Sequence, residues 1–271
     1  GHLAITDLVN GRHLFREVLT RPGPGRGGFP AVDADTVLAW CRAPAGTDGR
    51  WQIARTAAGG FTVRAADRRA GLLLDLDLAP QRPRVFQGPD GYSVKDPAAG
   101  AGSLYYSYTR LAARGRLAAG AETLTARGRA WLDREIFTSQ LAARHVGWDW
   151  LSLQLSDGRD VMVFVLRDTT GAPDVAHATV VGPGGQPRWF DPALDAMQPR
   201  RHWTSPQTGA RYPVAWDLEL PQAGLDLTVE ARVDAQENVG RRSGVVYWEG
   251  AVRARGPGGL TGRGYLEMTG Y

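Results

Sequence analysis

The sequence predicts an all-β protein built from antiparallel sheets. The 271 residues include 35 Gly and 17 Pro, which interrupt the chain too often for long helices. Apolar and polar residues alternate with a period of two in many short segments, which is the pattern of half-buried strands. Turn signals recur at a spacing of about 8–12 residues, as is typical of β-sandwiches and β-barrels.

The expected strands follow one another along the whole chain. Asp157-Gly158 separates two apolar runs and predicts a hairpin turn between them, because this dipeptide accommodates the positive φ angles of tight turns. The clearest strand patterns cover residues 60–65, 72–78, 105–111, 148–155, 160–166, 225–233 and 244–252. A segment of small and polar residues at 142–144 separates two strand-rich halves. We therefore expect two domains, residues 1–143 and residues 144–271.

Charge and composition exclude several classes of protein. The 32 Lys and Arg residues exceed the 28 Asp and Glu residues, but Lys95 is the only lysine, and the arginines are interleaved with acids along the chain. This distribution indicates an arginine-rich solvated surface and no nucleic-acid partner. No apolar run reaches about 18 residues, so no membrane span is expected. Cys41 is the single cysteine and the histidines are not paired at short spacing, so we expect no disulfide and no metal site.

The densest group of chemically active residues is Trp131-Leu-Asp-Arg-Glu135. On a strand, Asp133 and Glu135 share one face with Trp131 beside them, because side chains alternate between faces. Burial beside aromatic surface would raise the pKa of one carboxyl and create a general acid next to a base. The alternative is that Arg134 and the two acids form a solvated or structural ion-pair edge.

A second group lies at His145-Val-Gly-Trp-Asp-Trp150, with Gln154 further along. Trp148 and Trp150 share one face of the expected strand, and Asp149 lies on the other. The rings can form an apolar wall of a ligand cavity with Asp149 or His145 at its rim, or they can be core packing where a barrel closes. The same two interpretations apply to two further groups of residues, which are Tyr105 with Tyr106 and Tyr108, and Tyr247-Trp248-Glu249.

The motifs together resemble a known family over nearly the whole chain. They are His2–Asp7, Tyr105–Ser107, Trp131–Glu135, Gly147–Arg159, Gly209–Trp216, Tyr247–Gly250 and Gly264–Tyr271. In these stretches the chain resembles the lipocalin-like family of bacterial carotenoid 1,2-hydratases, AttH-type predicted secreted hydrolases and fungal lipocalin-like Diels–Alderases. The resemblance implies two packed lipocalin-like antiparallel β-barrel or sandwich domains that enclose a hydrophobic molecule, and chemistry without a cofactor.

Two departures from the family pattern bear on these expectations. Family members have a Trp-Trp-Tyr-type strand before the equivalent of His2–Asp7, so we expect an N-terminally truncated chain, a naturally short one, or a segment supplied separately or by a dimer partner. The hydratases resemble Asp-His-x-Trp where this chain has Asp133-Arg134-Glu135-Ile136, which weakens a specific carotenoid hydratase assignment. The family implies a periplasmic or secreted location, although the first residues lack the pattern of a signal peptide.

Two functions follow from these residues and from the resemblance. The first is a cofactor-independent enzyme that hydrates or cyclises a polyene or terpenoid. In it Asp133, Glu135 and Asp149 are the catalytic candidates, and the substrate-binding candidates are Tyr105, Tyr106, Trp131, Arg134, Trp148, Trp150, Gln154, Tyr247 and Trp248. The second is a non-catalytic carrier of a lipophilic ligand, or an accessory protein of the cell envelope or of a transporter, which uses the same aromatic cavity and needs no acid.

Overall fold

The computed structural model describes residues 1–21, 26–28, 36–44, 49–96, 100–137 and 141–271. The described residues form strands, turns and four short 3₁₀ helices, with no α-helix among them, so the predicted all-β class is confirmed. The 3₁₀ helices are η1 (Arg68–Ala70), η2 (Pro89–Gly91), η3 (Pro221–Ala223) and η4 (Pro257–Gly259). Within this part of the chain, no helix has the length and apolar character needed to cross a bilayer.

The chain forms two compact units. Unit 1 consists of Gly1–Arg82, Arg110–Ala130 and Val239–Val245, and unit 2 consists of Pro83–Thr109, Trp131–Asn238 and Val246–Tyr271. The long strands β10 (Ala101–Ala119) and β11 (Thr123–Phe137) each contribute one part to unit 1 and the other part to unit 2. The division into domains 1–143 and 144–271 stays a prediction.

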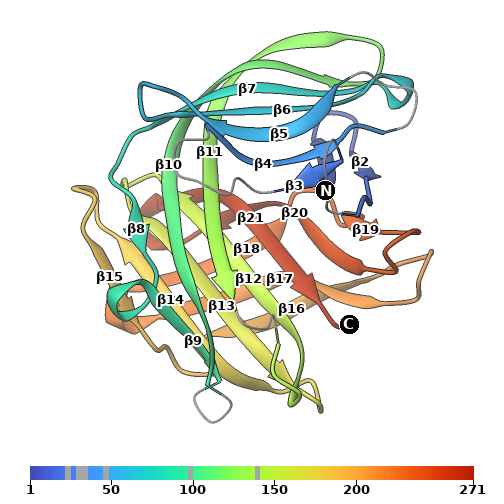
Figure 1. The fold of residues 1–271 in the computed structure, drawn as a ribbon. Coiled ribbons are helices and arrows are strands. Elements are labelled where there is room, and N and C mark those ends of the chain that lie inside the picture. Colours follow the sequence, from blue (N-terminus) through green and yellow to red (C-terminus); the bar gives the residue numbers. More distant parts are fainter. Residues whose placement is uncertain (22–25, 29–35, 45–48, 97–99, 138–140) are drawn as a thin grey trace. The chain divides into compact units, whose positions relative to one another are not determined.

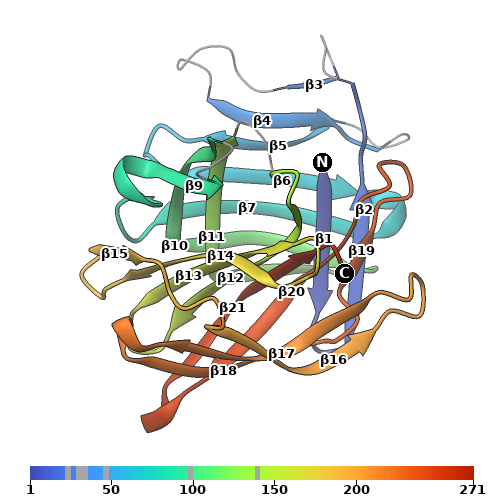
Figure 2. The ribbon, with the colours of Figure 1, turned by 90° about the horizontal axis from the view of Figure 1, so that it is seen from below.

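Unit 1 contains a two-stranded sheet and most of a larger antiparallel sheet. β1 and β2 pair with each other, and the larger sheet has the order β11-β10-β7-β6-β5-β4-β3 (Figure 2). The bounds are β1 (His2–Asp7), β2 (Arg12–Glu17), β3 (Gly27–Gly28), β4 (Val37–Arg42), β5 (Arg50–Arg55), β6 (Phe61–Asp67) and β7 (Leu72–Pro80). The predicted strands at 60–65 and 72–78 are thereby confirmed as β6 and β7.

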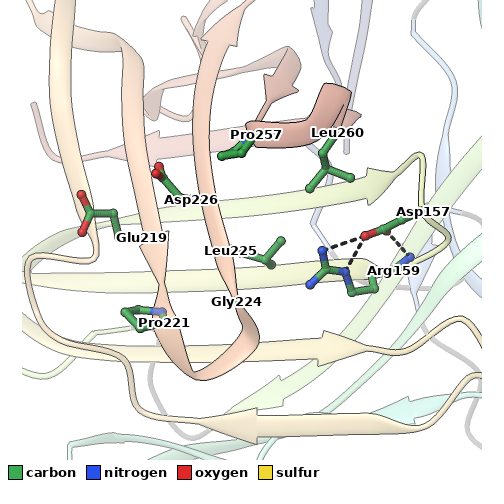
Figure 3. A pocket seen from close by; sticks show the side chains of 9 residues that line it. All are labelled: Asp157, Arg159, Glu219, Pro221, Gly224, Leu225, Asp226, Pro257 and Leu260. Carbon is green, nitrogen blue, oxygen red and sulfur yellow. Dashed lines mark hydrogen bonds and ion pairs between the residues drawn. The ribbon is translucent and has the colours of Figure 1, made fainter.

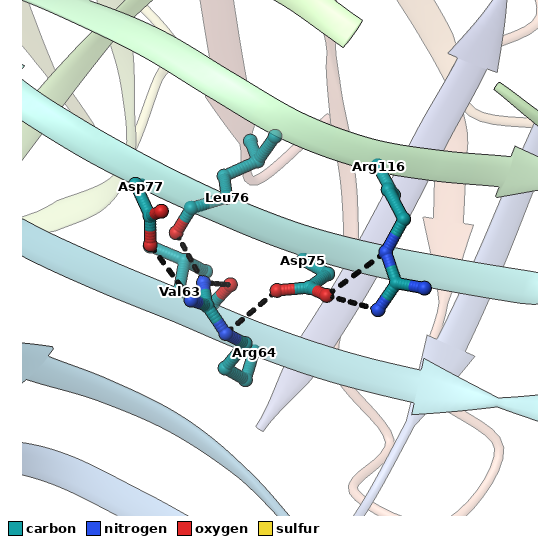
Figure 4. A network of polar contacts seen from close by, with 6 residues as sticks. All are labelled: Val63, Arg64, Asp75, Leu76, Asp77 and Arg116. Carbon is teal, nitrogen blue, oxygen red and sulfur yellow. Dashed lines mark hydrogen bonds and ion pairs between the residues drawn. The ribbon is translucent and has the colours of Figure 1, made fainter. Parts of the chain in front are cut away.

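A ladder of charged side chains crosses one face of the unit 1 sheet. Arg64 and Arg116 are both cross-strand partners of Asp75, and Figure 4 shows Asp75 between the two guanidinium groups. The Arg64 Nε–Asp75 Oδ1 and Arg116 Nη2–Asp75 Oδ2 distances are both 2.6 Å, and Arg64 also contacts Asp77 at 2.7 Å. Cross-strand pairs of this kind each contribute a few tenths of a kcal/mol to about 1 kcal/mol. The acids of this face are therefore neutralised by the arginines beside them.

Unit 2 is organised around a curled ten-stranded antiparallel sheet with the order β15-β14-β13-β12-β21-β20-β18-β17-β16, in which β19 also pairs with β20 (Figure 1). The first part of β10 pairs with the two short strands β8 (Val85–Phe86) and β9 (Tyr92–Asp96). The first five strands of the large sheet along the chain are β12 (His145–Leu155), β13 (Asp160–Asp168), β14 (Pro173–Val181), β15 (Pro187–Phe190) and β16 (Met197–Thr204). The others are β17 (Arg211–Leu220), β18 (Leu225–Ala231), β19 (Glu237–Val239), β20 (Val246–Arg255) and β21 (Thr261–Thr269).

The predicted hairpin at Asp157-Gly158 is confirmed. Gly158 has a φ of 90°, and the amide of Leu155 donates to the carbonyl of Arg159 at 2.8 Å, which joins the end of β12 to the start of β13. A positive φ is strained for other residues, so glycine is the natural residue at this position. The turn thereby sets the register in which Trp150 lies opposite Phe164.

Strands β12 and β13 are covered on both faces, and this places the candidate site. The odd-numbered residues of β12 from Leu151 to Leu155, together with Val161, Val163 and Val165 of β13, enter a large core that also contains the fully buried Trp248. The alternate residues of β13 enter a smaller cluster around Tyr105, against which Trp131, Trp148 and Trp150 pack. One face of these strands therefore packs against the large core. The other face carries mixed aromatic and polar groups, and the candidate site lies there.

Candidate functional site

One wall of the site is the face of the unit 2 sheet that points away from its large core. Residues opposite each other on neighbouring strands share a face, so the register gives the rows of this wall directly. The central row runs from Phe164 of β13 through Trp150 of β12 and Glu267 of β21 to Glu249 of β20. The rows on either side contain Leu166, Trp148, Thr269 and Tyr247, and Met162, Ser152 and Tyr265.

The second wall comes from β10 and β11. In β10 the residues Ser103, Tyr105 and Ser107 are buried, while Leu104 between them is exposed, so the strand presents its hydroxyl groups inward. The hydroxyl of Ser103 donates to Glu135 Oε1 at 2.5 Å, and the hydroxyl of Ser107 donates to Asp133 Oδ1 at 2.5 Å. Each carboxyl group of β11 is therefore held by its own serine on β10.

Aromatic contacts join the two walls within unit 2. The rings of Trp131 and Trp150 meet edge to face with their centroids 6.3 Å apart. The Nε1–H group of Trp150 donates to the hydroxyl of Tyr105 at 3.1 Å. The Trp150 indole and the Tyr105 phenol thus fix one another through their polar groups, as buried Trp and Tyr commonly do.

Asp133 lies at the centre of a converging set of neutral donors. Its Oδ1 atom accepts hydrogen bonds from Ser107 and from the indole Nε1 of Trp131, the latter at 2.8 Å, and Tyr105 also donates to the carboxyl group. Burial raises the pKa of Asp133 to about 6, although the three hydrogen bonds act in the opposite direction. Asp133 is nevertheless an exposed residue. A carboxyl group with a raised pKa that is still exposed can transfer a proton to a small molecule.

A directed chain of hydrogen bonds supports Asp133 from behind. Thr179 donates to Gln87 Oε1 at 2.6 Å, Gln87 Nε2 donates to the hydroxyl of Ser107 at 2.8 Å, and Ser107 donates to Asp133. Every donor in this chain points toward Oδ1, so that oxygen acts as an acceptor.

Glu135 has a charged partner instead. The Nζ atom of Lys95 lies 2.9 Å from Glu135 Oε1, and it also lies 3.8 Å from the ring centroid of Phe164 and 5.5 Å from that of Tyr105. Lys95 is only 8% exposed. Burial lowers the pKa of the ammonium group, and the charges of Glu135 and Asp133 partly oppose this shift. The two carboxyl groups of β11 thus have different electrostatic environments.

Two more acids stand on the facing wall. Glu249 and Glu267 are directly opposite each other on β20 and β21, and the indole Nε1 of Trp148 donates to Glu267 at 3.2 Å. Burial raises the pKa of Glu249 to about 8, with a further rise from the charge of Glu267. Burial also raises the pKa of Glu267 to about 7, and the charges of Asp133 and Glu135 add to this shift. The site therefore binds protons readily near neutral pH.

The structure brings eight of the predicted site residues together and places four elsewhere. Those that share the two walls are Tyr105, Trp131, Asp133, Glu135, Trp148, Trp150, Gln154 and Tyr247. Trp248 is fully buried in the large core on the other face of the sheet. Tyr106 and Arg134 alternate with site residues and so lie on the opposite faces of β10 and β11; the Tyr106 ring lies under the guanidinium group of Arg84 at 5.0 Å.

Asp149 also lies on the core side of β12. It is buried, it lies 3.2 Å from Nε of Arg167, and it accepts a hydrogen bond from the hydroxyl of Tyr271 at 2.8 Å. The guanidinium group of Arg167 is stacked 3.9 Å from the centroid of the Tyr271 ring. Burial raises the pKa of Asp149 to about 6, with Arg167 and Tyr271 opposing the shift. Its contacts are those of a structural ion pair inside the sheet.

Sequence reasoning did not select several residues that the fold adds to the site. They are Gln87, Lys95, Ser103, Ser107, Tyr265 and Glu267. Lys95 carried one usable signal, because it is the only lysine in a chain with 31 arginines. Gln87 lies between β8 and η2 and the others lie in β10 and β21, and their proximity to Asp133 depends on contacts over long separations in sequence.

A hollow elsewhere in unit 2 has fewer reactive groups. It has a volume of about 580 Å³ at the turns between β12 and β13, β17 and β18, and β20 and β21 (Figure 3). Figure 3 shows its basic residue, Arg159, bound to Asp157 beside it, and the same guanidinium group also donates to the carbonyl of Ala223 at 2.8 Å. Among the described residues there is no group of three or more His, Cys, Asp or Glu side chains placed to hold a metal ion.

Comparison with known proteins gives consistent matches over the whole chain. The family model described as AttH-like matches residues 1–271. Among solved structures, a protein described as an AttH from Nitrosomonas europaea superposes with a TM-score of 0.84 and 31% sequence identity, covering 100% of this chain and 80% of that chain. Kievitone hydratase from Nectria haematococca superposes with a TM-score of 0.75 and 16% identity, covering 99% of this chain and 78% of that chain. The sheets therefore have a lipocalin-like fold, as the sequence resemblance implied. No curated protein sequence matches.

Proposed function

Because the chain belongs to the AttH-like family, we propose that it is a hydratase-type enzyme that acts on a hydrophobic, unsaturated small molecule by acid–base chemistry without a cofactor. The observation that carries this proposal is the pairing of Asp133 and Glu135 in unlike environments beside a wall of tryptophan rings. Two carboxyl groups whose surroundings push them toward different protonation states are the usual basis for a general acid and a general base. The name of the fold neighbour kievitone hydratase is consistent with this reaction class.

The proposed reaction adds water across a carbon–carbon double bond. The proton of the neutral Asp133 carboxyl group transfers to one carbon, the π bond breaks, and the positive charge develops on the more substituted carbon. The faces of Trp131 and Trp150 stabilise that cation. A water oxygen then bonds to the cationic carbon while Glu135 accepts a proton from the water. Asp133 ends as a carboxylate and Glu135 as a neutral acid, and proton exchange with solvent restores both.

The substrate class follows from the lining. Indole and phenol rings offer broad apolar faces, which suit a polyene or terpenoid chain, and the polar groups gather around Asp133 and Glu135. The same site would promote cyclisation if it folded such a chain into a reactive conformer and excluded water. We assign no proton-transfer role to Asp149, because it lies on the other face of β12 against Arg167.

The test is turnover of a panel of polyenes and prenylated aromatic compounds in ¹⁸O-labelled water, followed by mass spectrometry. We expect incorporation of one labelled water by the wild type, and a loss of about 100-fold or more in Asp133→Asn and in Glu135→Gln. Glu230→Gln, which removes an acid from the exposed Arg253–Glu230 pair, is the matched control and should retain full activity. Unchanged turnover in both site variants would refute the proposal.

The carrier function gives a different outcome in the same experiment. A lipophilic ligand would then be bound and recovered chemically unchanged from the wild type and from both variants. The inward position of Asp133 and Glu135 favours the enzyme, since a carrier requires no acid beside its aromatic wall.

A further inference from the structure

The chain has 31 arginines but a single lysine, and that lysine is buried in the candidate site. Lys95 extends from β9 so that its ammonium group contacts Glu135 and lies over the ring of Phe164. An ammonium group is a compact point charge, whereas a guanidinium group is a broad planar fork. The Lys95 position therefore delivers one positive charge to one carboxyl group.

The positive charge of Lys95 acts more strongly on Glu135 than on Asp133. Glu135 has an ammonium group at 2.9 Å and the hydroxyl of Ser103 at 2.5 Å. Among the described residues, the donors in contact with Asp133 are the neutral groups of Ser107, Trp131 and Tyr105. A cation in contact favours the ionised form of a carboxyl group more strongly than neutral hydrogen bonds do.

We propose that Lys95 is a positioning residue that keeps Glu135 ionised, so that Asp133 is the carboxyl group of the pair that holds the proton. The consequence for catalysis rests on the proposed hydration, in which Glu135 is the base and Asp133 the acid. The charge assignment itself requires no substrate. It also explains how two acids on the same strand face, two residues apart, acquire separate roles.

Other titratable groups also face Asp133 and Glu135. Tyr105 of β10 lies under the ammonium group, Glu267 of β21 interacts with both acids, and Glu249 of β20 lies behind Glu267. His177 of β14 also contacts Phe164, with ring centroids 5.0 Å apart. The acids outnumber the cations here, so the loss of Lys95 leaves carboxyl groups that repel one another, and Glu135 should then bind a proton at higher pH.

The experiment follows the carboxyl carbon of Glu135 by NMR in protein labelled with ¹³Cδ-glutamate, with the resonance assigned by its absence in Glu135→Gln. In the wild type we expect Glu135 to remain ionised at pH values where Asp133, followed in the same way with ¹³Cγ-aspartate, is protonated. In Lys95→Met the acid dissociation constant of Glu135 should fall by about tenfold or more. Lys95→Arg should restore most of this shift, and Arg253→Met, which removes a cation from an exposed pair, should cause none.

A second measurement keeps the proposal testable if Lys95→Met does not fold. Because Lys95 is the only lysine, ¹⁵N-lysine labelling gives a single side-chain Nζ signal. Glu135→Gln should increase the acid dissociation constant of that ammonium group by about tenfold, since a buried cation then loses its counter-charge.

The outcomes separate this proposal from the proposed function. A Glu135 titration that is the same in the wild type and in Lys95→Met overturns the role of Lys95, as does an Nζ titration that Glu135→Gln leaves unchanged. If both titrations shift as expected but no compound of the panel takes up water, the assignment of charge stands and the hydratase proposal fails.

Discussion

Glu249 and Glu267 lie directly opposite each other on the neighbouring antiparallel strands β20 and β21. Among the residues that the structure describes, no basic side chain forms an ion pair with either of them. Like charges at such positions repel, so the folded protein favours the neutral forms. Unit 1 treats its acids differently, because there Asp75 lies between two arginines (Figure 4).

This pair makes the free energy of unfolding depend on pH. The folded-state pKa values of Glu249 and Glu267, about 8 and about 7, lie above the ordinary value of 4.5. Between these values the folded state binds more protons than the unfolded state, so the stabilisation is complete below about pH 4.5 and is lost as pH rises through 7 to 8. We expect the double variant Glu249→Gln, Glu267→Gln to lose less stability than the wild type between pH 5 and pH 8, by several kcal/mol.

Urea denaturation at pH 5 and pH 8 measures this difference. Glu230→Gln serves as the control, since Glu230 is paired with Arg253 at 2.7 Å on the surface and should leave the pH dependence unchanged. Equal slopes of stability against pH in the wild type and the double variant would contradict the prediction.

The buried pair of Asp149 and Arg167 should act on stability rather than on catalysis. Arg167→Met leaves a buried carboxylate without its cation, which we expect to cost about 3–5 kcal/mol in the free energy of unfolding. Adding Asp149→Asn should recover part of that loss, because the uncompensated charge is then gone. Chemical denaturation of the two single variants and the double variant gives the coupling energy, and strictly additive effects would show that the two residues do not interact.

Substitutions of two tryptophans on opposite faces of the same sheet should affect different properties, namely stability for Trp248 and ligand binding for Trp150. Trp248 is fully buried in the large core, so Trp248→Ala should cost about 3–5 kcal/mol in unfolding free energy. Trp150→Phe keeps an aromatic ring but loses the hydrogen bond to Tyr105, so we expect a cost of only about 1 kcal/mol together with weaker ligand binding. Denaturation and fluorescence titration with a polyene measure the two effects. Weaker binding in Trp248→Phe but not in Trp150→Phe would reverse the assignment of faces.

Ser107 should tune the acid. Its hydrogen bond lowers the pKa of Asp133, which burial has raised to about 6, so Ser107→Ala should raise that pKa further by roughly half a unit to one unit. The neutral acid then persists to higher pH, and the alkaline limb of the profile of kcat/KM against pH moves upward. Ser156→Ala, at an exposed turn, is the control. A limb that stays in place or moves to lower pH would show that Asp133 is not the acid.

Local patterns in the sequence were sufficient for the strands and for part of the site. Alternation and the Asp157-Gly158 turn predict β12 and β13 because both depend on the geometry of neighbouring residues. The shared face of Asp133 and Glu135 follows from the same period of two. The sequence also predicted opposite faces for Asp149 and for Trp148 with Trp150, but it contained no information on which face of β12 meets β10 and β11.

The sequence by itself determined an all-β chain, a family, and one strand that carries two acids beside a tryptophan. Only the tertiary structure decided which groups surround those acids. Lys95 reaches Glu135 across 40 residues of chain, and Trp148 reaches Glu267 across 119. Burial and charge depend on every atom within a few ångströms, whatever its distance along the sequence. For that reason the protonation states that decide this chemistry belong to the fold and not to any motif.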